Sequence, residues 1–135
     1  MELSASAVWN GDLKSGDGQL FTKSGLLDDT DYGLKPGRYP EELIGAAHAG
    51  CMAMVLAMIL DKKGHTADRV EAKADVTVKG DSGGYEITKS HLTIRAKVPG
   101  ARENDFKKAA EVAKNGCPVS KALKPEITMD ATLED

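Results

Sequence analysis

The alternation of apolar and polar positions predicts strands on both sides of one long uncharged stretch. Residues 3 to 29 hold short β-prone runs separated by turns rich in Gly and Asp, which is typical of a small antiparallel meander. Apolar residues alternate with polar ones over residues 70 to 79, 87 to 98 and 127 to 133, which predicts three more strands. Residues 89 to 91 break the alternation of the middle strand, so we expect a β-bulge there.

The uncharged stretch, residues 43 to 60, reads LIGAAHAGCMAMVLAMIL and predicts a long helix. Pro40 followed by two glutamates is a start signal, because the first turn needs no N–H from proline and favours carboxylates. The stretch is long enough to span a membrane, but small residues and His48 dilute its first half, and we reject a span. A helix that is apolar all round is covered by protein on every side. Since 135 residues are too few to cover it, we predict an intimate homodimer.

A second helix is predicted over residues 102 to 115, followed by a short one that begins at Pro118. Gly116 separates the two. The apolar face of the first comprises Phe106, Ala109, Ala110, Val112 and Ala113. Strands and helices therefore follow in the order βββ, α, ββ, α, α, β, which indicates an α+β fold rather than a doubly wound sheet. We expect a single domain over residues 1–135.

Composition and charge exclude several classes of protein. The chain is 41% hydrophobic and 29% charged, with a net charge of −3, as in an ordinary soluble globular protein. Its 18 Lys and Arg are interleaved with 21 Asp and Glu, so no basic patch for nucleic acid is expected. The first residues have neither a basic nor an apolar signal region. We therefore expect a cytoplasmic protein that binds neither nucleic acid nor a membrane.

Two cysteines, Cys51 and Cys117, are the candidate chemical groups. They lie 66 positions apart, so they form no local CxxC motif. In a reducing cytosol they are either inert thiols or a redox couple that cycles. A cysteine on an apolar helix is most often a small buried hydrophobe. Reactivity requires a cation or a helix N-terminus that lowers the thiol pKa below its usual value of about 8.5.

Local sequence supplies one such feature beside each cysteine. His48 lies one turn before Cys51 on the same face of the helix, and it either assists the thiol or is a hydrogen-bonded core histidine. Cys117 lies at or beside the N-cap of the short helix, where free N–H groups and the helix dipole favour a negative sulfur. The alternative for Cys117 is that small residues are simply tolerated at helix joints.

Other catalytic chemistries are poorly supported. The two cysteines, His48, His65 and His91 are candidate metal ligands, but no two of them have CxxC or HxxxH spacing, which argues against a zinc site. The GxSxG motif of serine hydrolases and the glycine-rich phosphate loops are absent from the sequence.

Two long segments resemble a known family. Residues 40 to 51, PEELIGAAHAGC, closely resemble the signature of the OsmC/Ohr family, and residues 113 to 120, AKNGCPVS, are similar to its second signature. The likeness extends from Trp9 to Asp130 and favours the OsmC branch. It implies an intertwined homodimer with antiparallel sheets around long central buried helices and two active sites at the subunit interface. It also implies a thiol peroxidase that acts on organic hydroperoxides.

The resemblance implies a role for each cysteine. Cys51 corresponds to the peroxidatic cysteine, which is oxidised to a sulfenic acid, and Cys117 to the resolving one, which condenses with it to a disulfide. A dihydrolipoyl protein is the implied reductant, and neither a metal nor haem is needed. The apolar surroundings of Cys51 would favour lipid-like or aromatic hydroperoxides over hydrogen peroxide.

The family also has an arginine ahead of the first signature, held by the first glutamate of that signature. Here these residues correspond to Arg38 and Glu41, in a loop that is shorter than the family usually has. Glu41 and Cys51 are ten positions apart, about 15 Å along a helix at 1.5 Å per residue. Either the helix breaks near Gly45 or the Arg38 and Glu41 pair comes from the partner chain.

Two further functions stay open at this stage. One is a non-catalytic dimer with the same fold, either a stress-structural protein or one that binds a small ligand in its apolar interface. The retained cysteines argue against it, and the short arginine loop argues faintly for it. The other is a thiol redox sensor that peroxide oxidises but that dihydrolipoamide does not recycle.

Overall fold

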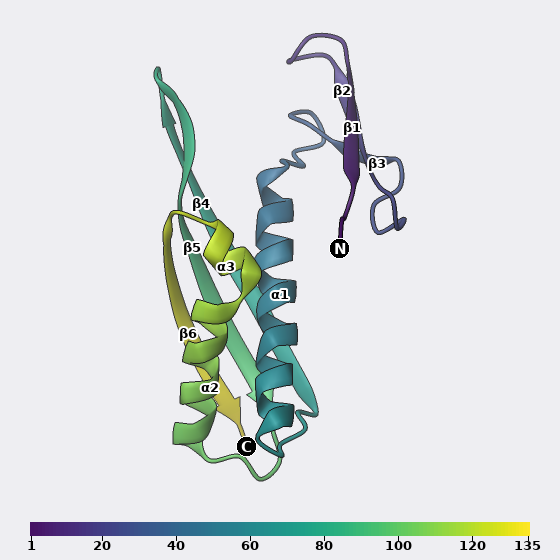
Figure 1. Ribbon diagram of the computed structural model, residues 1–135. Helices are drawn as coiled ribbons and strands as arrows, with labels where there is room; N and C mark the ends of the chain where they lie inside the picture. Colours follow the sequence, from purple (N-terminus) through teal and green to yellow (C-terminus); the bar gives the residue numbers. More distant parts are fainter. The chain divides into compact units, whose positions relative to one another are not determined.

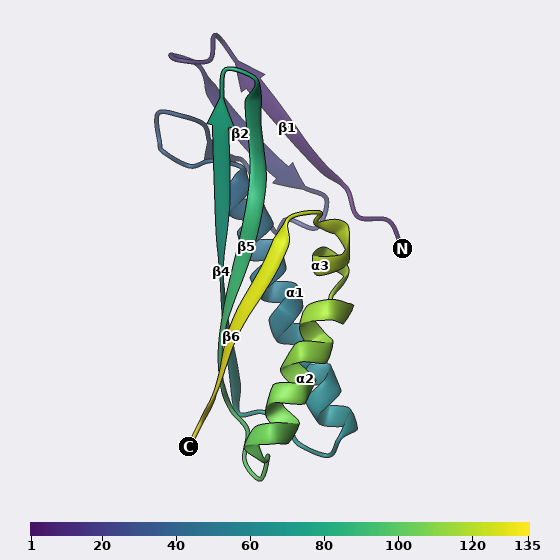
Figure 2. The ribbon, with the colours of Figure 1, turned by 90° about the vertical axis from the view of Figure 1, so that its left-hand side faces the viewer.

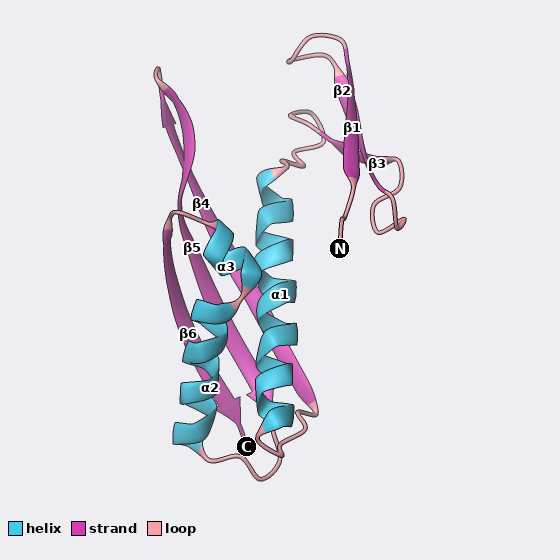
Figure 3. Cartoon of the chain, in the orientation of Figure 1, coloured by secondary structure: helices cyan, strands magenta, loops and turns pink.

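The computed structural model describes residues 1 to 135 and contains six strands and three helices (Figure 1, Figure 3). In chain order these are β1 (Ala5–Asn10), β2 (Asp17–Thr22), β3 (Thr30–Tyr32), α1 (Glu41–Lys62), β4 (Arg69–Asp81), β5 (Gly84–Lys97), α2 (Glu103–Gly116), α3 (Pro118–Ala122) and β6 (Glu126–Glu134). This order confirms the α+β class. The chain divides into two compact units, Met1–Leu43 and Ile44–Asp135, and its behaviour as a single domain stays a prediction.

The first unit is the predicted antiparallel meander. β1 pairs with β2, and β2 pairs with β3, both in antiparallel register. The rings of Trp9 and Tyr32 meet edge to face with their centroids 5.7 Å apart. Both rings pack over Gly18, where an added Cβ would lie only 2.6 Å from the Trp9 ring. Packing of two of the few aromatic residues in the chain therefore stabilises the meander.

The second unit is a three-stranded sheet with helices on one face (Figure 2). β4 and β5 form a long antiparallel hairpin, whereas β6 runs parallel to β5. The sheet is therefore mixed rather than purely antiparallel, because α2 and α3 provide the long crossover that a parallel pair requires. The core between sheet and helices contains Met52, Leu56, Leu60, Leu92, Ile94, Ala96, Val98, Phe106, Ala109, Ala110 and Ala113.

The structure corrects two predictions, the position of the β-bulge and the core face of α2. Thr77 pairs with Lys89 and Val78 pairs with Ile87, so Thr88 has no partner and forms the bulge just before the predicted stretch. Val112 is 57% exposed and does not belong to the core face of α2. The four other predicted core positions of α2 follow the i, i+3, i+4, i+7 spacing, and Val112 falls outside that stripe.

The long helix α1 starts and stops where its sequence signals predict. At its end, Gly64 has a positive φ of 83°, the Gly64 N–H donates to Asp61 O and the His65 N–H donates to Leu60 O, which is the Schellman pattern. The buried residues of α1 form one stripe that ends in Met52, Leu56 and Leu60.

Much of the remaining surface of α1 is not covered by the rest of the unit Ile44–Asp135. Met54 is 75% exposed and Met58 is 48% exposed. By length and composition α1 would be able to cross a membrane, and only 28% of its most apolar 18-residue window is buried. Large exposed apolar surfaces mark interaction sites. The predicted homodimer, which stays a prediction, would cover this one.

Candidate functional site

The fold brings the two cysteines together. Cys51 lies in the middle of α1 and is half-buried, whereas Cys117 is fully buried at the N-cap of α3. The predicted N-cap position of Cys117 is thus confirmed, with Pro118 in the first turn. Both thiols are free, and they lie close enough for each to affect the pKa of the other through a hydrogen bond. Two residues distant in sequence therefore form one dithiol centre.

Within the chain, Cys51 is the less acidic thiol. Burial raises its pKa, the hydrogen bond with Cys117 raises it further, and the backbone N–H of Val119 opposes this rise only in part. None of the groups that set this pKa is a cation. The residues of the second unit, Ile44–Asp135, therefore do not by themselves activate Cys51 as a thiolate.

Cys117 has the lower pKa of the two. Burial acts to raise it, but hydrogen bonds from Cys51, from the backbone and hydroxyl of Ser120 and from the backbone of Val119 outweigh burial and lower the pKa. The Cys117 side chain itself makes no N-cap hydrogen bond. The start of α3 therefore surrounds the dithiol centre with hydrogen-bond donors.

His48 is the hydrogen-bonded core histidine that one of the two interpretations predicted. Its side chain is fully buried, with Nδ1 2.7 Å from Ser90 Oγ on β5 and Nε2 2.8 Å from Ser120 Oγ on α3. Burial lowers the pKa of His48, so the ring is held neutral. The sequence did not single out either serine, although Ser90 lies in the stretch that breaks the strand pattern and Ser120 ends the second signature.

Arg38 and Glu41 both belong to the unit Met1–Leu43. Arg38 is exposed in a loop closed by paired backbone hydrogen bonds with Gly33, at 2.9 and 3.2 Å. Glu41 is the first residue of α1, and no ion pair joins it to Arg38 within the chain. The helix is continuous past Gly45, so the expectation of a break there is wrong. That the Arg38 and Glu41 pair comes from a partner chain stays a prediction.

His91 lies on β5 and contacts two residues of β6 rather than either cysteine. His91 contacts Thr128 Oγ1 through Nδ1 and Asp130 Oδ2 through Nε2, at 3.1 Å for the second pair. No group of three or more His, Cys, Asp or Glu side chains is placed to hold a metal ion.

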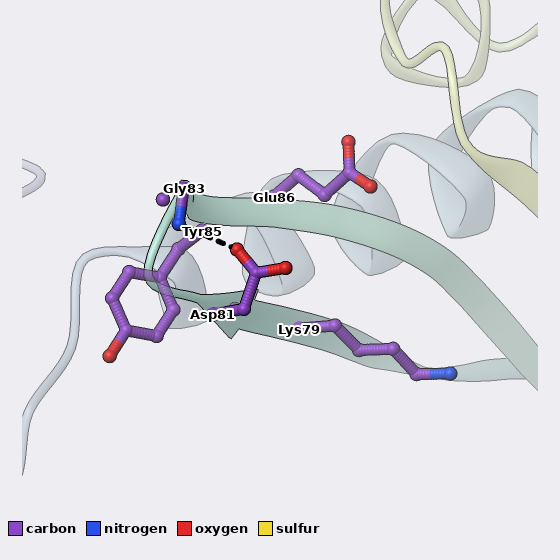
Figure 4. A pocket seen from close by; sticks show the side chains of 7 residues that line it. Lys79, Asp81, Gly83, Tyr85 and Glu86 are labelled. Carbon is purple, nitrogen blue, oxygen red and sulfur yellow. Dashed lines mark hydrogen bonds between the residues drawn. The ribbon is translucent and has the colours of Figure 1, made fainter.

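A pocket lies elsewhere, at the turn between β4 and β5 (Figure 4). The Gly83 N–H donates to Asp81 Oδ1 at 2.7 Å, and the Tyr85 ring packs on the backbone of Gly80, where an added Cβ would collide with it. The lining residues are Lys79, Gly80, Asp81, Gly83, Gly84, Tyr85 and Glu86. Because this pocket contains no nucleophilic thiol, the dithiol centre is the stronger candidate site.

Comparisons with known proteins agree with this choice. The family model described as OsmC-like protein matches residues 33–132, which include Arg38, Glu41 and both cysteines. The Peroxiredoxin OsmC of Escherichia coli (strain K12) is 42% identical over 134 residues, which cover 95% of this chain and 94% of that protein.

Solved structures show the same fold. An OsmC like protein from Mycoplasma pneumoniae aligns with a TM-score of 0.82 over 100% of this chain and 99% of that chain, at 14% identity. The organic hydroperoxide resistance protein OhrB of Bacillus subtilis aligns with a TM-score of 0.67 over 97% of this chain and 98% of that chain, at 21% identity. Together with the match over both cysteines and the relative of 42% identity, these likenesses establish that the chain belongs to the OsmC family.

Proposed function

We propose that the protein is a thiol peroxidase that reduces organic hydroperoxides to alcohols at Cys51. The observation that carries this proposal is the approach of two free thiols from distant parts of the chain. The Cys51 thiolate attacks the terminal peroxide oxygen, the O–O bond breaks, and the alkoxide takes up a proton and leaves as an alcohol. Cys51 is then a sulfenic acid.

The second step uses Cys117. Its sulfur forms a bond with the Cys51 sulfur, the S–O bond of the sulfenic acid breaks, and hydroxide leaves as water with the proton that the Cys117 thiol gives up. One hydroperoxide and two thiols thus give one alcohol, one water and one disulfide. The 42% identical relative is named a peroxiredoxin, which supports this chemistry for the present chain.

The substrate class follows from the surroundings of Cys51. The thiol lies on a helix whose residues 43 to 60 carry no charge. Such surroundings favour a hydroperoxide with an apolar alkyl or aryl group over hydrogen peroxide, because apolar contact stabilises the bound substrate. The name of OhrB, an organic hydroperoxide resistance protein with the same fold, is consistent with this substrate class.

Activation of Cys51 is assigned to Arg38 and Glu41 of the partner subunit in a homodimer. Since burial raises the pKa of Cys51, a cation must offset it for the thiolate to form near neutral pH. Arg38 would supply the cation and Glu41 would orient the guanidinium. The dimer would also cover the exposed face of α1.

Turnover requires a two-electron reductant for the disulfide. We assign this role to a dithiol such as a dihydrolipoyl protein, which reduces a disulfide by thiol exchange through a mixed disulfide. The cytoplasm keeps such dithiols reduced and is the compartment that we propose. The two thiols hold the electrons themselves, so the proposed reaction uses no metal, haem or other cofactor.

The proposed dimer is tested by Met54→Lys. The substitution places a charge on the exposed apolar face of α1, where burial of an unpaired ammonium in an interface is strongly unfavourable. We expect at least about tenfold weaker association, seen by analytical ultracentrifugation at micromolar concentration. Val112→Lys on α2 is the control, because it adds the same charge at another exposed apolar residue. A wild-type monomer, or equal effects of the two substitutions, would contradict the proposed interface.

The proposed reaction is tested by counting thiols in reduced protein after one equivalent of cumene hydroperoxide. We expect rapid loss of two thiols per chain and slower loss with hydrogen peroxide, because the site is apolar. Restoration of both thiols by dihydrolipoamide would support the reductant class, and oxidation without restoration would favour a redox sensor. Slow loss that is equal for both peroxides would favour the non-catalytic, ligand-binding dimer.

A further inference from the structure

His48 connects the three elements that surround the dithiol centre. It lies on α1, three residues before Cys51, so the two side chains share one face of the helix. Its Nε2 is 2.8 Å from the hydroxyl of Ser120, which follows Cys117 by three residues on α3. Its Nδ1 is 2.7 Å from the hydroxyl of Ser90 on β5. Through these two hydrogen bonds, one buried ring on the helix of Cys51 contacts both the helix that Cys117 caps and the sheet.

We propose that His48 is a positioning residue for disulfide formation, holding Ser120, and with it Cys117, at the sulfur of Cys51. Its role in a reaction rests on the proposed peroxidase function. In that function the peroxide reacts with Cys51, which is half-buried and therefore accessible. His48 and Cys117 are both fully buried. The contribution of His48 therefore belongs to the second step, the bond between the two sulfurs.

The partners of His48 allow the ring to adopt either neutral form. A neutral imidazole donates from one nitrogen and accepts at the other, whereas a hydroxyl donates or accepts. Both partners are hydroxyls, so neither fixes which nitrogen of His48 carries the proton. A carboxylate at either position would have fixed the proton on the nitrogen that faces it.

The direction of these hydrogen bonds should depend on the state of Cys117. In the reduced protein we expect the Ser120 hydroxyl, three residues after the N-cap Cys117, to donate to the Cys117 sulfur, so that Nε2–H donates to Ser120 and Nδ1 accepts from Ser90. In the disulfide the sulfur is a weak acceptor. The Ser120 hydroxyl then turns to Nε2, and Nδ1–H donates to Ser90. The ring neither gains nor loses a proton overall.

The switch between these two forms is directly measurable by nitrogen NMR of protein labelled at histidine. Spectra are compared for protein reduced with dithiothreitol and protein oxidised to the disulfide with diamide, so no peroxide is involved. We expect the proton of His48 to lie on Nε2 in the reduced protein and on Nδ1 in the disulfide. The same tautomer in both states would overturn the proposed coupling between His48 and Cys117.

Kinetics of three variants separate positioning from a merely structural role. With one equivalent of cumene hydroperoxide, Ser120→Ala should slow disulfide formation about tenfold, since it removes the buried hydrogen bond by which His48 holds α3, and with it Cys117, in place. Formation of the sulfenic acid, followed with a sulfenic-acid trap, should change by less than about twofold, because Cys51 itself is untouched. Ser120→Thr keeps the hydroxyl and should restore most of the rate of disulfide formation.

Ser90→Ala is the matched control, because it removes the other buried hydroxyl from the same ring and leaves the link to Ser120 in place. Its effect on disulfide formation should be smaller than that of Ser120→Ala. Equal slowing by the two alanines, or equal slowing of both chemical steps, would overturn the assignment. If peroxide oxidises neither thiol, the proposed function fails, and the NMR comparison still decides the coupling of His48 to Cys117.

Discussion

Cys51→Ser is expected to abolish hydroperoxide reduction, with a loss of at least about a thousandfold in rate, because a serine hydroxyl is neither a thiolate nor oxidisable by peroxide. Cys117→Ser should instead keep the first step and stop at the sulfenic acid. Thiol counts then distinguish the two variants after one equivalent of cumene hydroperoxide. Cys51→Ser should keep its remaining thiol, and Cys117→Ser should lose its one thiol to a species that a sulfenic-acid trap captures.

The comparison is informative because acidity and access favour different cysteines. Within the chain, Cys117 has the lowered pKa and Cys51 the raised one, which by itself would make Cys117 the better nucleophile. Cys117 is fully buried, however, and Cys51 is half-buried, so a peroxide reaches Cys51 first. A sulfenic acid on Cys117 in the Cys51→Ser protein, formed at the wild-type rate, would reverse the proposed roles.

Arg38→Ala is expected to slow oxidation of Cys51 by about tenfold to a hundredfold at pH 7, because loss of a nearby cation raises the thiol pKa and lowers the fraction of thiolate. The sign follows from the thiolate, which a positive charge favours, so the variant should regain rate as the pH rises. The measurements are the pH dependence of thiol oxidation in single-turnover experiments and the thiolate absorbance of the reduced protein. Lys35→Ala is the control, because it removes a cation from the same loop.

Mixed dimers test whether Arg38 acts across the subunit interface. Chains that carry Cys51→Ser are unfolded, mixed in equal amounts with chains that carry Arg38→Ala, and refolded together. If each site combines Cys51 of one chain with Arg38 of the other, about a quarter of the wild-type activity returns, since half the dimers are mixed and each has one intact site. If Arg38 acts within its own chain, or not at all, the mixture shows no more activity than the separate variants.

The sequence by itself predicted most of the secondary structure, because those signals are local. Pro40 with its acidic neighbours and Gly64 mark the ends of α1, and the period-two patterns mark β4, β5 and β6. The N-cap position of Cys117 was likewise predicted from Gly116 and Pro118 alone. The errors were also local: the bulge lies at Thr88, and Val112 faces outward, where a one-residue step on a strand or helix changes the face.

Tertiary structure decided what the local pattern leaves open. Cys51 and Cys117 are 66 residues apart, and only the packing of α1 against α3 makes them one centre. The same packing chose between the two interpretations of His48, because its partners Ser90 and Ser120 come from elements 42 and 72 residues away. It also showed that β6 is parallel to β5, and that α1 keeps an uncovered apolar face. Periodicity in the sequence indicates which side of a helix or strand is apolar, whereas only the folded chain shows which element packs on that side.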